Sequence, residues 1–225
     1  MITLFHRAKT RSTRFIFLLE ELEAPYEIRF VTTRSHDGTG SVDAANPHPN
    51  GKVPAISDEG VIVFESPAIA LYLTDKFQKN HLGPLVGERD RGAYLSWLCY
   101  YTGVFEPALM SKFQNVEVVR VTAGWVPLDE ALGAIADALG TGPYLLGERF
   151  SALDVLYGTT FAMFAGNSML PTSAGLDEYA KRVVARPAFG RALARDAGWP
   201  RNPVGGVSSK MIVGAWHSSY DCAIT

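Results

Sequence analysis

The hydrophobic pattern changes once along the chain, and this change constrains the fold more than any other feature. Over the first 77 residues, apolar runs of strand length alternate with apolar repeats of helical spacing. Beyond residue 90 the strand signals fade, and apolar residues recur at steps of three and four, the spacing of one helix face. The pattern predicts an α/β domain followed by an all-α domain.

The first part of the chain is expected to form one mixed sheet. Apolar runs at 2–6 and 26–31 flank a helical repeat and predict a βαβ unit. Runs at 53–56 and 61–64, joined by Asp58-Glu59-Gly60, predict a hairpin, and a helix should follow from Ser66. A crossover helix makes the first pair of strands parallel, whereas a short turn makes the second pair antiparallel.

The second part of the chain is expected to be helical. The repeat from Leu95 to Leu109 predicts a long helix, which Pro107 should kink because proline removes a backbone donor. Ser151-Ala152-Leu153-Asp154 is a capping box and predicts the start of a core-spanning helix. Further helices are expected at 128–139, 176–186 and 188–196. We predict domains at 1–78 and 88–198, and a C-terminal extension at 199–225.

Composition argues against several classes of function. The 21 basic and 23 acidic side chains leave a formal net charge of −2, so no global field attracts nucleic acid or an anionic membrane. The N-terminus lacks the features of a secretion signal, and no apolar run reaches the length of a membrane span. Two cysteines are too few for a disulfide scaffold or a cysteine zinc site. We therefore expect a cytoplasmic protein without metal, nucleic-acid or membrane partners.

Two strings, separated by less than ten residues, carry most of the chemical information. Residues 46–56 read Asn-Pro-His-Pro-Asn-Gly-Lys-Val-Pro-Ala-Ile, and residues 64–73 read Phe-Glu-Ser-Pro-Ala-Ile-Ala-Leu-Tyr-Leu. Together they resemble the glutathione transferase superfamily, in its bacterial cytosolic type. The resemblance extends over residues 1–196 and includes the capping box. It implies a thioredoxin-like first domain, a helical second domain, a homodimer, and glutathione as co-substrate.

The residue types in these strings suit a site for a small peptide with free termini. In the family the bond before the equivalent of Pro54 is cis, which turns the backbone of Val53 outward to pair with an extended ligand. The helix start at Ser66 offers free N–H groups to a carboxylate, and Glu65 can pair with an amine. The expected glutathione-binding residues are Lys52, Val53, Pro54, Glu65, Ser66 and His36.

The residue that would activate the thiol is expected in the loop before the first helix. In the family a hydroxyl or thiol there donates a hydrogen bond to the glutathione sulfur and so favours the thiolate. In this chain His6 to Arg14 resembles the Arg-Ser-x-Arg helix start of bacterial members. We place Ser12 first, with Thr10 as its rival and Arg11 as an electrostatic contributor. The alternative for Ser12 is that it only caps the helix.

The second substrate is expected between this loop and the long helix of the second domain. Such a substrate would be a small, largely apolar electrophile, and an apolar wall should hold it. An aromatic stripe at helical spacing can also belong to the core, so packing is the alternative role. The candidates for the wall are Tyr101, Phe105, Met110 and Phe113.

The absence of cysteine from residues 1–98 narrows the range of reactions that the protein can catalyse. The first domain cannot perform thiol–disulfide exchange through a thiolate of its own. What remains is attack by bound glutathione thiolate on an electrophilic carbon, which is the reaction of a glutathione transferase in detoxification. Two alternatives stay open: a glutathione-dependent isomerase or ether-cleaving lyase, and a non-catalytic binding module with the same fold.

Overall fold

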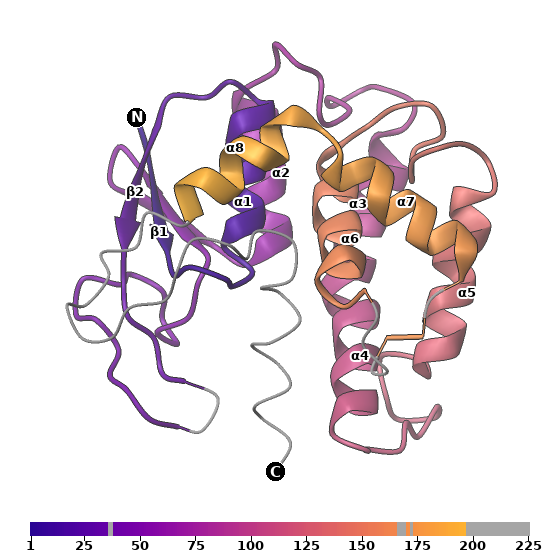
Figure 1. Cartoon of the computed structure of the whole chain (residues 1–225). Coiled ribbons are helices and arrows are strands. Elements are labelled where there is room, and N and C mark those ends of the chain that lie inside the picture. Colours follow the sequence, from indigo (N-terminus) through magenta and orange to yellow (C-terminus); the bar gives the residue numbers. More distant parts are fainter. Residues whose placement is uncertain (36–37, 166–169, 172, 197–225) are drawn as a thin grey trace.

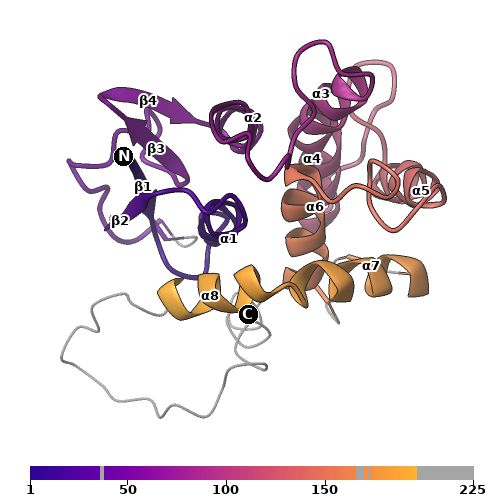
Figure 2. The same cartoon turned by 90° about the horizontal axis from the view of Figure 1, so that it is seen from above.

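The N-terminal part of the chain folds around one four-stranded sheet. The computed structural model describes residues 1–35, 38–165, 170–171 and 173–196. The strands are β1 (Ile2–His6), β2 (Tyr26–Phe30), β3 (Ala55–Asp58) and β4 (Val61–Phe64), in the order β2-β1-β3-β4 (Figure 1, with β3 and β4 labelled in Figure 2). β1 pairs parallel with β2 and antiparallel with β3, and β3 pairs antiparallel with β4. The mixed sheet expected from the sequence is confirmed.

Two helices, α1 (Thr13–Glu21) and α2 (Ser66–Lys76), lie on the side of this sheet that faces the helical part of the chain (Figure 2). α1 is buried from Thr13 to Leu19, on all sides of the helix. It packs against α6 (Ala152–Met163) and α8 (Pro187–Asp196) as well as against β1. Because a helix covered on all sides must be apolar all round, this contact explains the run Phe15-Ile16-Phe17-Leu18-Leu19.

The remaining elements are all helical. They are α3 (Arg91–Tyr100), the π-helical turn η1 (Tyr101–Phe105), α4 (Glu106–Phe113), α5 (Leu128–Leu139) and α7 (Ala174–Val184), besides α6 and α8. α6 is buried from Ala152 to Phe161, so it is the core-spanning helix that the sequence predicts. Its capping box forms, with the Asp154 carboxylate accepting the Ser151 N–H at 2.8 Å. The thioredoxin-like domain followed by a helical domain is therefore confirmed.

The long helix predicted around Pro107 is interrupted one turn earlier than the proline. The Glu106 N–H bonds to the Tyr101 carbonyl, five residues back, instead of following the α-helical pattern. In an α-helix the missing N–H of Pro107 would leave the Gly103 carbonyl without its partner. A π-helical turn is a common way to absorb such a break, and such turns occur often at functional sites.

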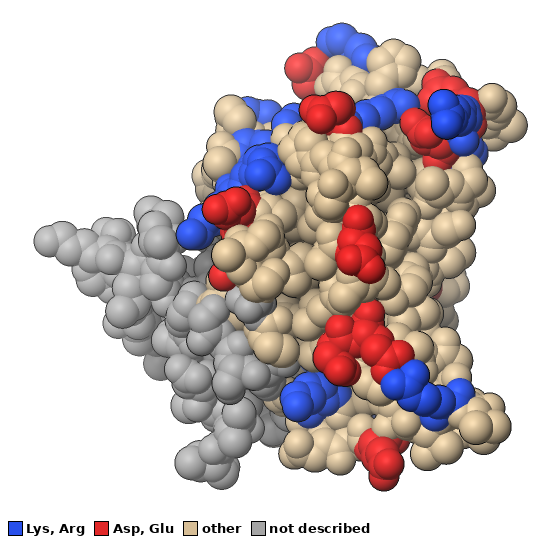
Figure 3. Space-filling view, turned by 90° about the vertical axis from the view of Figure 1, so that its right-hand side faces the viewer, with Lys and Arg blue, Asp and Glu red and all other residues tan. Residues whose placement is uncertain are grey.

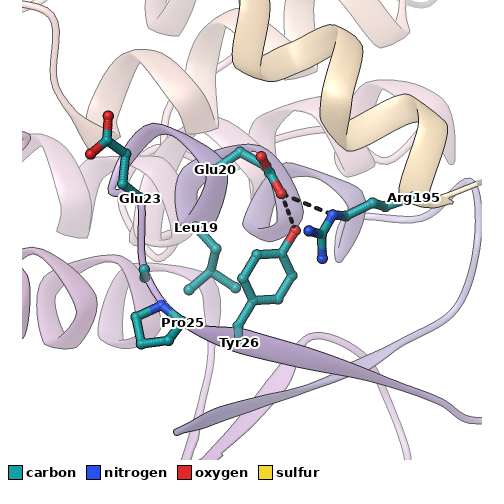
Figure 4. A pocket seen from close by; sticks show the side chains of 7 residues that line it. Leu19, Glu20, Glu23, Pro25, Tyr26 and Arg195 are labelled. Carbon is teal, nitrogen blue, oxygen red and sulfur yellow. Dashed lines mark hydrogen bonds and ion pairs between the residues drawn. The ribbon is translucent and has the colours of Figure 1, made fainter.

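α8 returns to the first domain and lies along α1 (Figure 2). Arg186 pairs with Glu21 at 2.7 Å, and Arg191 and Arg195 pair with Glu20 at 2.7 and 3.0 Å. A cleft of about 320 Å³ opens beside these contacts (Figure 4). Its acidic groups already have partners, since Glu20 also accepts the Tyr26 hydroxyl at 2.6 Å and Glu23 pairs with Lys79 at 2.9 Å. We therefore interpret this cleft as part of the contact between α1 and α8.

The surface carries charged side chains of both signs. On the face seen in Figure 3, acidic and basic side chains are interspersed among uncharged residues. Within the described ranges, no helix is long and apolar enough to cross a membrane. The domain limits at 1–78 and 88–198 stay predictions, and the extension at 199–225 lies outside the described residues.

Candidate functional site

The candidate residues come together because their strands end at the same edge of the sheet. Phe5 in β1 is opposite Arg29 in β2 and Ala55 in β3, and Ala55 is opposite Phe64 in β4. The carboxyl ends of β1, β2 and β4 therefore meet the amino end of β3. The loop at 7–13, the Val53-Pro54 segment and the start of α2 all leave the sheet there.

We call the residues Val53, Pro54, Glu65 and Ser66 the strand-edge site, in which Val53 and Ser66 present unpaired groups. The Val53–Pro54 bond is cis, as expected. Among the described residues, Val53 makes no backbone–backbone hydrogen bond. Glu65 precedes α2 with a φ of 69° and does not cap the helix with its side chain. A positive φ is unusual for a residue other than glycine, and such backbone conformations cluster at ligand sites.

Ser66 occupies the first position of α2. Its side chain is 5% exposed, and it has no side-chain hydrogen bond within the described part of the chain. N–H groups in the first turn of a helix have no partner inside the helix and face the positive end of its dipole. The start of α2 can therefore bind an anion with backbone and hydroxyl donors together.

Asn46 and His48 hold the segment before Pro54, a role that the sequence reading did not assign to them. The Asn46 side chain donates to the Lys52 carbonyl at 3.0 Å and accepts the His48 N–H at 3.1 Å. His48 Nδ1 accepts the Asn50 N–H at 3.1 Å, and its Nε2 lies 3.8 Å from Glu65. Burial lowers the pKa of His48, which opposes protonation of the accepting nitrogen. The signal in the sequence was the alternation of polar residues with prolines over 46–50.

Family models match most of this architecture. The model of the glutathione S-transferase N-terminal domain matches residues 1–75, and that of the C-terminal domain matches residues 119–195. Glutathione S-transferase 3 of Schizosaccharomyces pombe is 43% identical over 174 residues, covering 68% of this chain and 70% of the relative. The chain belongs to the glutathione transferase superfamily.

Two further proteins resemble it over a larger share of the chain. A sphingomonad glutathione S-transferase, solved in complex with glutathione, is 28% identical with a TM-score of 0.67, covering 87% of this chain and 98% of that protein. The disulfide-bond oxidoreductase YfcG of Escherichia coli is 26% identical and covers 87% of this chain and 95% of the relative. Membership in the superfamily therefore leaves the reaction open.

The two candidate hydroxyls, Ser12 and Thr10, differ in burial. Both belong to residues 7–13, which we call the hydroxyl loop. The Ser12 hydroxyl has no exposed surface and lies 2.7 Å from His6 Nδ1 and 2.8 Å from Thr10 Oγ1. It also accepts the Arg7 N–H at 3.3 Å. Thr10 is half-buried, and its hydroxyl donates to the Arg7 carbonyl at 2.7 Å. Of the two candidates, only Thr10 has a hydroxyl on a partly exposed side chain.

Arg11 joins the hydroxyl loop to the helical domain. Its Nε lies 2.6 Å from Glu106 of α4 in an ion pair, and its side chain is 42% exposed. This pair places the start of α4 beside the hydroxyl loop, where the sequence predicts the second substrate. Arg14, one turn later, is buried and donates to the hydroxyls of Tyr101 and Thr160.

The four residues expected to form the substrate wall divide into two pairs. Tyr101 and Phe105 are both 0% exposed. Tyr101 packs edge to face on Tyr157 at 5.0 Å between ring centroids, and Phe105 stacks on Tyr157 at 5.6 Å. Their position matches the alternative role in the core, because aromatic residues of η1 face α6 across a packed interior. Met110 and Phe113 of α4 are half-buried and keep surface that a ligand could contact.

The remaining candidates differ in what the structure says of them. Lys52 is exposed beside the strand-edge site. His36 lies outside the described residues.

A cleft of about 480 Å³ opens between the hydroxyl loop and the segment after β2, and Arg7 lines it. The Arg7 guanidinium donates to the Thr33 hydroxyl at 2.7 Å and has no acidic partner among the described residues. Its charge is therefore not neutralised by a neighbouring carboxylate.

Proposed function

We propose that this protein is a glutathione transferase that binds glutathione at the strand-edge site and activates its sulfur for attack on a small electrophile. One observation carries the proposal: unpaired backbone groups at Val53 and free donors at Ser66 meet at one edge of the sheet. An extended peptide can pair with Val53 as an added strand. The γ-glutamyl carboxylate would bind the N–H groups and hydroxyl of Ser66, and Glu65 would pair with the amino group.

Thr10 is the hydroxyl that we assign to the sulfur. The free thiol has a pKa of about 8.5, so most of it is protonated at neutral pH. A hydrogen bond from Thr10 favours the thiolate over the thiol, and the released proton leaves to solvent. The thiolate then forms a carbon–sulfur bond with the electrophile, and the leaving group departs with the electron pair of the broken bond. Arg11 and the start of α1 add positive potential near the sulfur.

The second substrate would lie between the hydroxyl loop and α4. The contact between Arg11 and Glu106 brings these two elements together, and Met110 and Phe113 offer apolar surface on α4. The nearby Arg7 charge would favour an electrophile that carries an anionic group. An apolar body with an anionic group is therefore the substrate class to screen first.

Calorimetric titration with glutathione, followed by assays with a panel of model electrophiles, tests the proposal. We expect saturable binding and a thioether product that retains the glutathione sulfur. Saturable binding without turnover would favour the non-catalytic module. Turnover that leaves no sulfur on the product would favour an isomerase or lyase. Absence of any binding would refute the proposal.

A second candidate is reduction of small disulfides with glutathione. Similarity to a disulfide-bond oxidoreductase favours it, and the chain has no cysteine before Cys99 to perform the exchange itself. Both thiols would then come from the ligand: two glutathione molecules are oxidised to glutathione disulfide while one substrate disulfide gains two electrons and two protons. Formation of glutathione disulfide in stoichiometric amounts, without conjugate, distinguishes this reaction from transfer.

We also expect a homodimer in the cytoplasm, as is usual for the family. Side chains of the edge strand β4 leave apolar surface uncovered, with Val61 58% and Ile62 39% exposed. Association of two copies would cover such surface. Analytical ultracentrifugation of the purified chain measures the oligomeric state, and a monomer at micromolar concentration would exclude the dimer.

A further inference from the structure

The last described residue of α8 reaches into the hydroxyl loop from the other end of the chain. Asp196 is 6% exposed, and its Oδ1 accepts the Thr13 hydroxyl at 2.7 Å. Its two oxygens lie 3.3 and 3.2 Å from the Lys9 nitrogen, whose N–H they accept. Lys9 has a φ of 57°, so the loop turns sharply where the carboxylate holds it. One buried carboxylate therefore fixes two points of the loop.

Asp196 also faces His6, the last residue of β1. His6 has no exposed surface, and its Nε2 lies 3.0 Å from Asp196 Oδ1. The two atoms are at ion-pair distance, but they do not form a hydrogen bond. On the other side of the ring, His6 Nδ1 lies 2.7 Å from Ser12 Oγ. His6 therefore lies between Asp196 and Ser12 and contacts both.

Ser12 in turn contacts the candidate hydroxyl of Thr10, since their two oxygens lie 2.8 Å apart. The Ser12 N–H lies 3.3 Å from Thr10 Oγ1 and donates to it, so the Thr10 oxygen is held from one side. The Thr10 hydroxyl donates to the Arg7 carbonyl at 2.7 Å, so a sulfur that enters the site would have to take over this hydrogen. A line of contacts thus runs from α8 to the hydroxyl that we assign to the sulfur.

The same three residue types form the triad of serine hydrolases, but the arrangement here differs in two respects. In those enzymes the nucleophilic serine contacts Nε2 and the aspartate contacts Nδ1. Here the two nitrogens are exchanged, and Ser12 has no exposed surface with which to attack a substrate. The geometry fits a role in holding other groups, since a buried hydroxyl cannot act as a nucleophile.

We infer that Asp196 is a positioning residue for thiolate activation, acting through His6 and Ser12 on Thr10. The inference rests on the proposed function. It predicts that part of the catalytic competence of the first domain depends on a side chain of the last described helix. The exchange rate of the Lys9 amide hydrogen should rise when Asp196 is removed, whether or not glutathione is present.

The test compares kcat and KM of the full chain and its variants with glutathione and a model electrophile that the wild type conjugates. We expect Asp196→Ala to lower kcat by about tenfold or more while KM for glutathione stays close to the wild-type value, because displaced catalytic groups cost rate more than binding. Asp196→Asn should recover most of kcat, since its Oδ1 can still accept from the Lys9 N–H and the Thr13 hydroxyl. It also keeps the inference testable if the alanine variant fails to fold.

A double-mutant cycle separates positioning from a purely structural role. In a Ser12→Ala background, Asp196→Ala should lower kcat much less than in the wild type, because the path to Thr10 is already cut. Arg191→Ala is the matched control: it removes another contact between α8 and α1, the pair with Glu20 at 2.7 Å, and should leave kcat unchanged.

The outcomes separate this inference from the function on which it rests. Unchanged kcat in Asp196→Ala, in a protein whose wild type binds and conjugates glutathione, would overturn the inference and leave the proposed function intact. Additive losses in the cycle would overturn it as well. A wild type that does not bind glutathione would refute the proposed function and the inference together.

Discussion

The strand-edge site and the hydroxyl loop lie at the same edge of the sheet but are built in opposite ways. The strand-edge site leaves groups without partners, as at Val53 and Ser66, and is open to a ligand. The hydroxyl loop finds partners for its groups within the protein, with Ser12 fully buried among four polar contacts. The strand-edge site can bind a ligand, whereas the hydroxyl loop holds one hydroxyl in position. Changes in the first should therefore affect affinity, and changes in the second should affect rate.

Thr10→Ala should have the largest effect, and it tests most directly whether changes in the hydroxyl loop affect rate more than affinity. We expect kcat to fall by about a hundredfold, the usual cost of one donor to a developing or bound anion, with little change in glutathione affinity. Thr10→Ser keeps the hydroxyl and serves as the control. Steady-state kinetics measures both. If Ser12→Ala lowers kcat more than Thr10→Ala does, the assignment of the two hydroxyls must be reversed.

Tyr101→Phe tests whether the aromatic residues of η1 belong to the core. The change removes the hydroxyl that buried Arg14 and Thr160 both contact, and it keeps the ring. We expect a loss of about 1–3 kcal/mol in the free energy of unfolding, because buried donors lose a partner, and no change in KM for the electrophile. Denaturant unfolding measures the first quantity.

Phe113→Ala is the matched comparison for Tyr101→Phe. Phe113 is half-buried on α4, so truncation should raise KM for the electrophile and disturb stability less. The opposite result, with KM raised only by Tyr101→Phe, would return the buried pair to the substrate wall.

Ser66→Ala should weaken glutathione binding by about 1–2 kcal/mol, or roughly 5–30-fold in Kd, through loss of a charge-assisted hydrogen bond. The turnover of bound glutathione should be preserved, since the hydroxyl loop is untouched. Titration calorimetry measures the affinity, and kcat at saturating glutathione is the control. Unchanged affinity would remove Ser66 from the site.

His48 should give the smallest effect, a loss of glutathione affinity in mild acid. Burial lowers the pKa of His48 below its ordinary value of 6.5, so the folded loop disfavours the charged ring. Its stabilising contribution is complete above the unfolded pKa and is lost as pH falls below it, because protonation of Nδ1 breaks the bond from the Asn50 N–H. His48→Asn, which cannot be protonated there, should show a flatter profile of Kd against pH. Equal profiles would exclude His48 as the cause.

The sequence predicts best where backbone geometry demands a particular residue type. The strands and the capping box at Ser151 and Asp154 were expected because period and cap each have one local meaning. The cis bond before Pro54 was expected from the resemblance to the family. The start of α2 at Ser66 follows from the same kind of rule. Such features depend on residues within a few positions of one another.

The features that the sequence did not predict depend on contacts between distant segments. Tyr101 and Phe105 have the helical spacing of a pocket wall and of a core alike, and only the position of α6 decides between them. The sequence places Ser12 ahead of Thr10 for the contact with sulfur, whereas the burial of Ser12 favours our proposal of Thr10, and such burial cannot be judged from neighbours along the chain. Asp196 carried no signal at all, since its partners lie more than 180 residues earlier.

The contact between Asp196 and Lys9 joins positions 187 residues apart. During synthesis the first domain emerges long before its last helix, and domains usually fold as units in that order. The first domain could thus fold and even capture its peptide ligand while the ribosome is still at work. Full catalytic competence would arrive only after residue 196 has been made and docked, so an incomplete chain would be a binder before it is an enzyme.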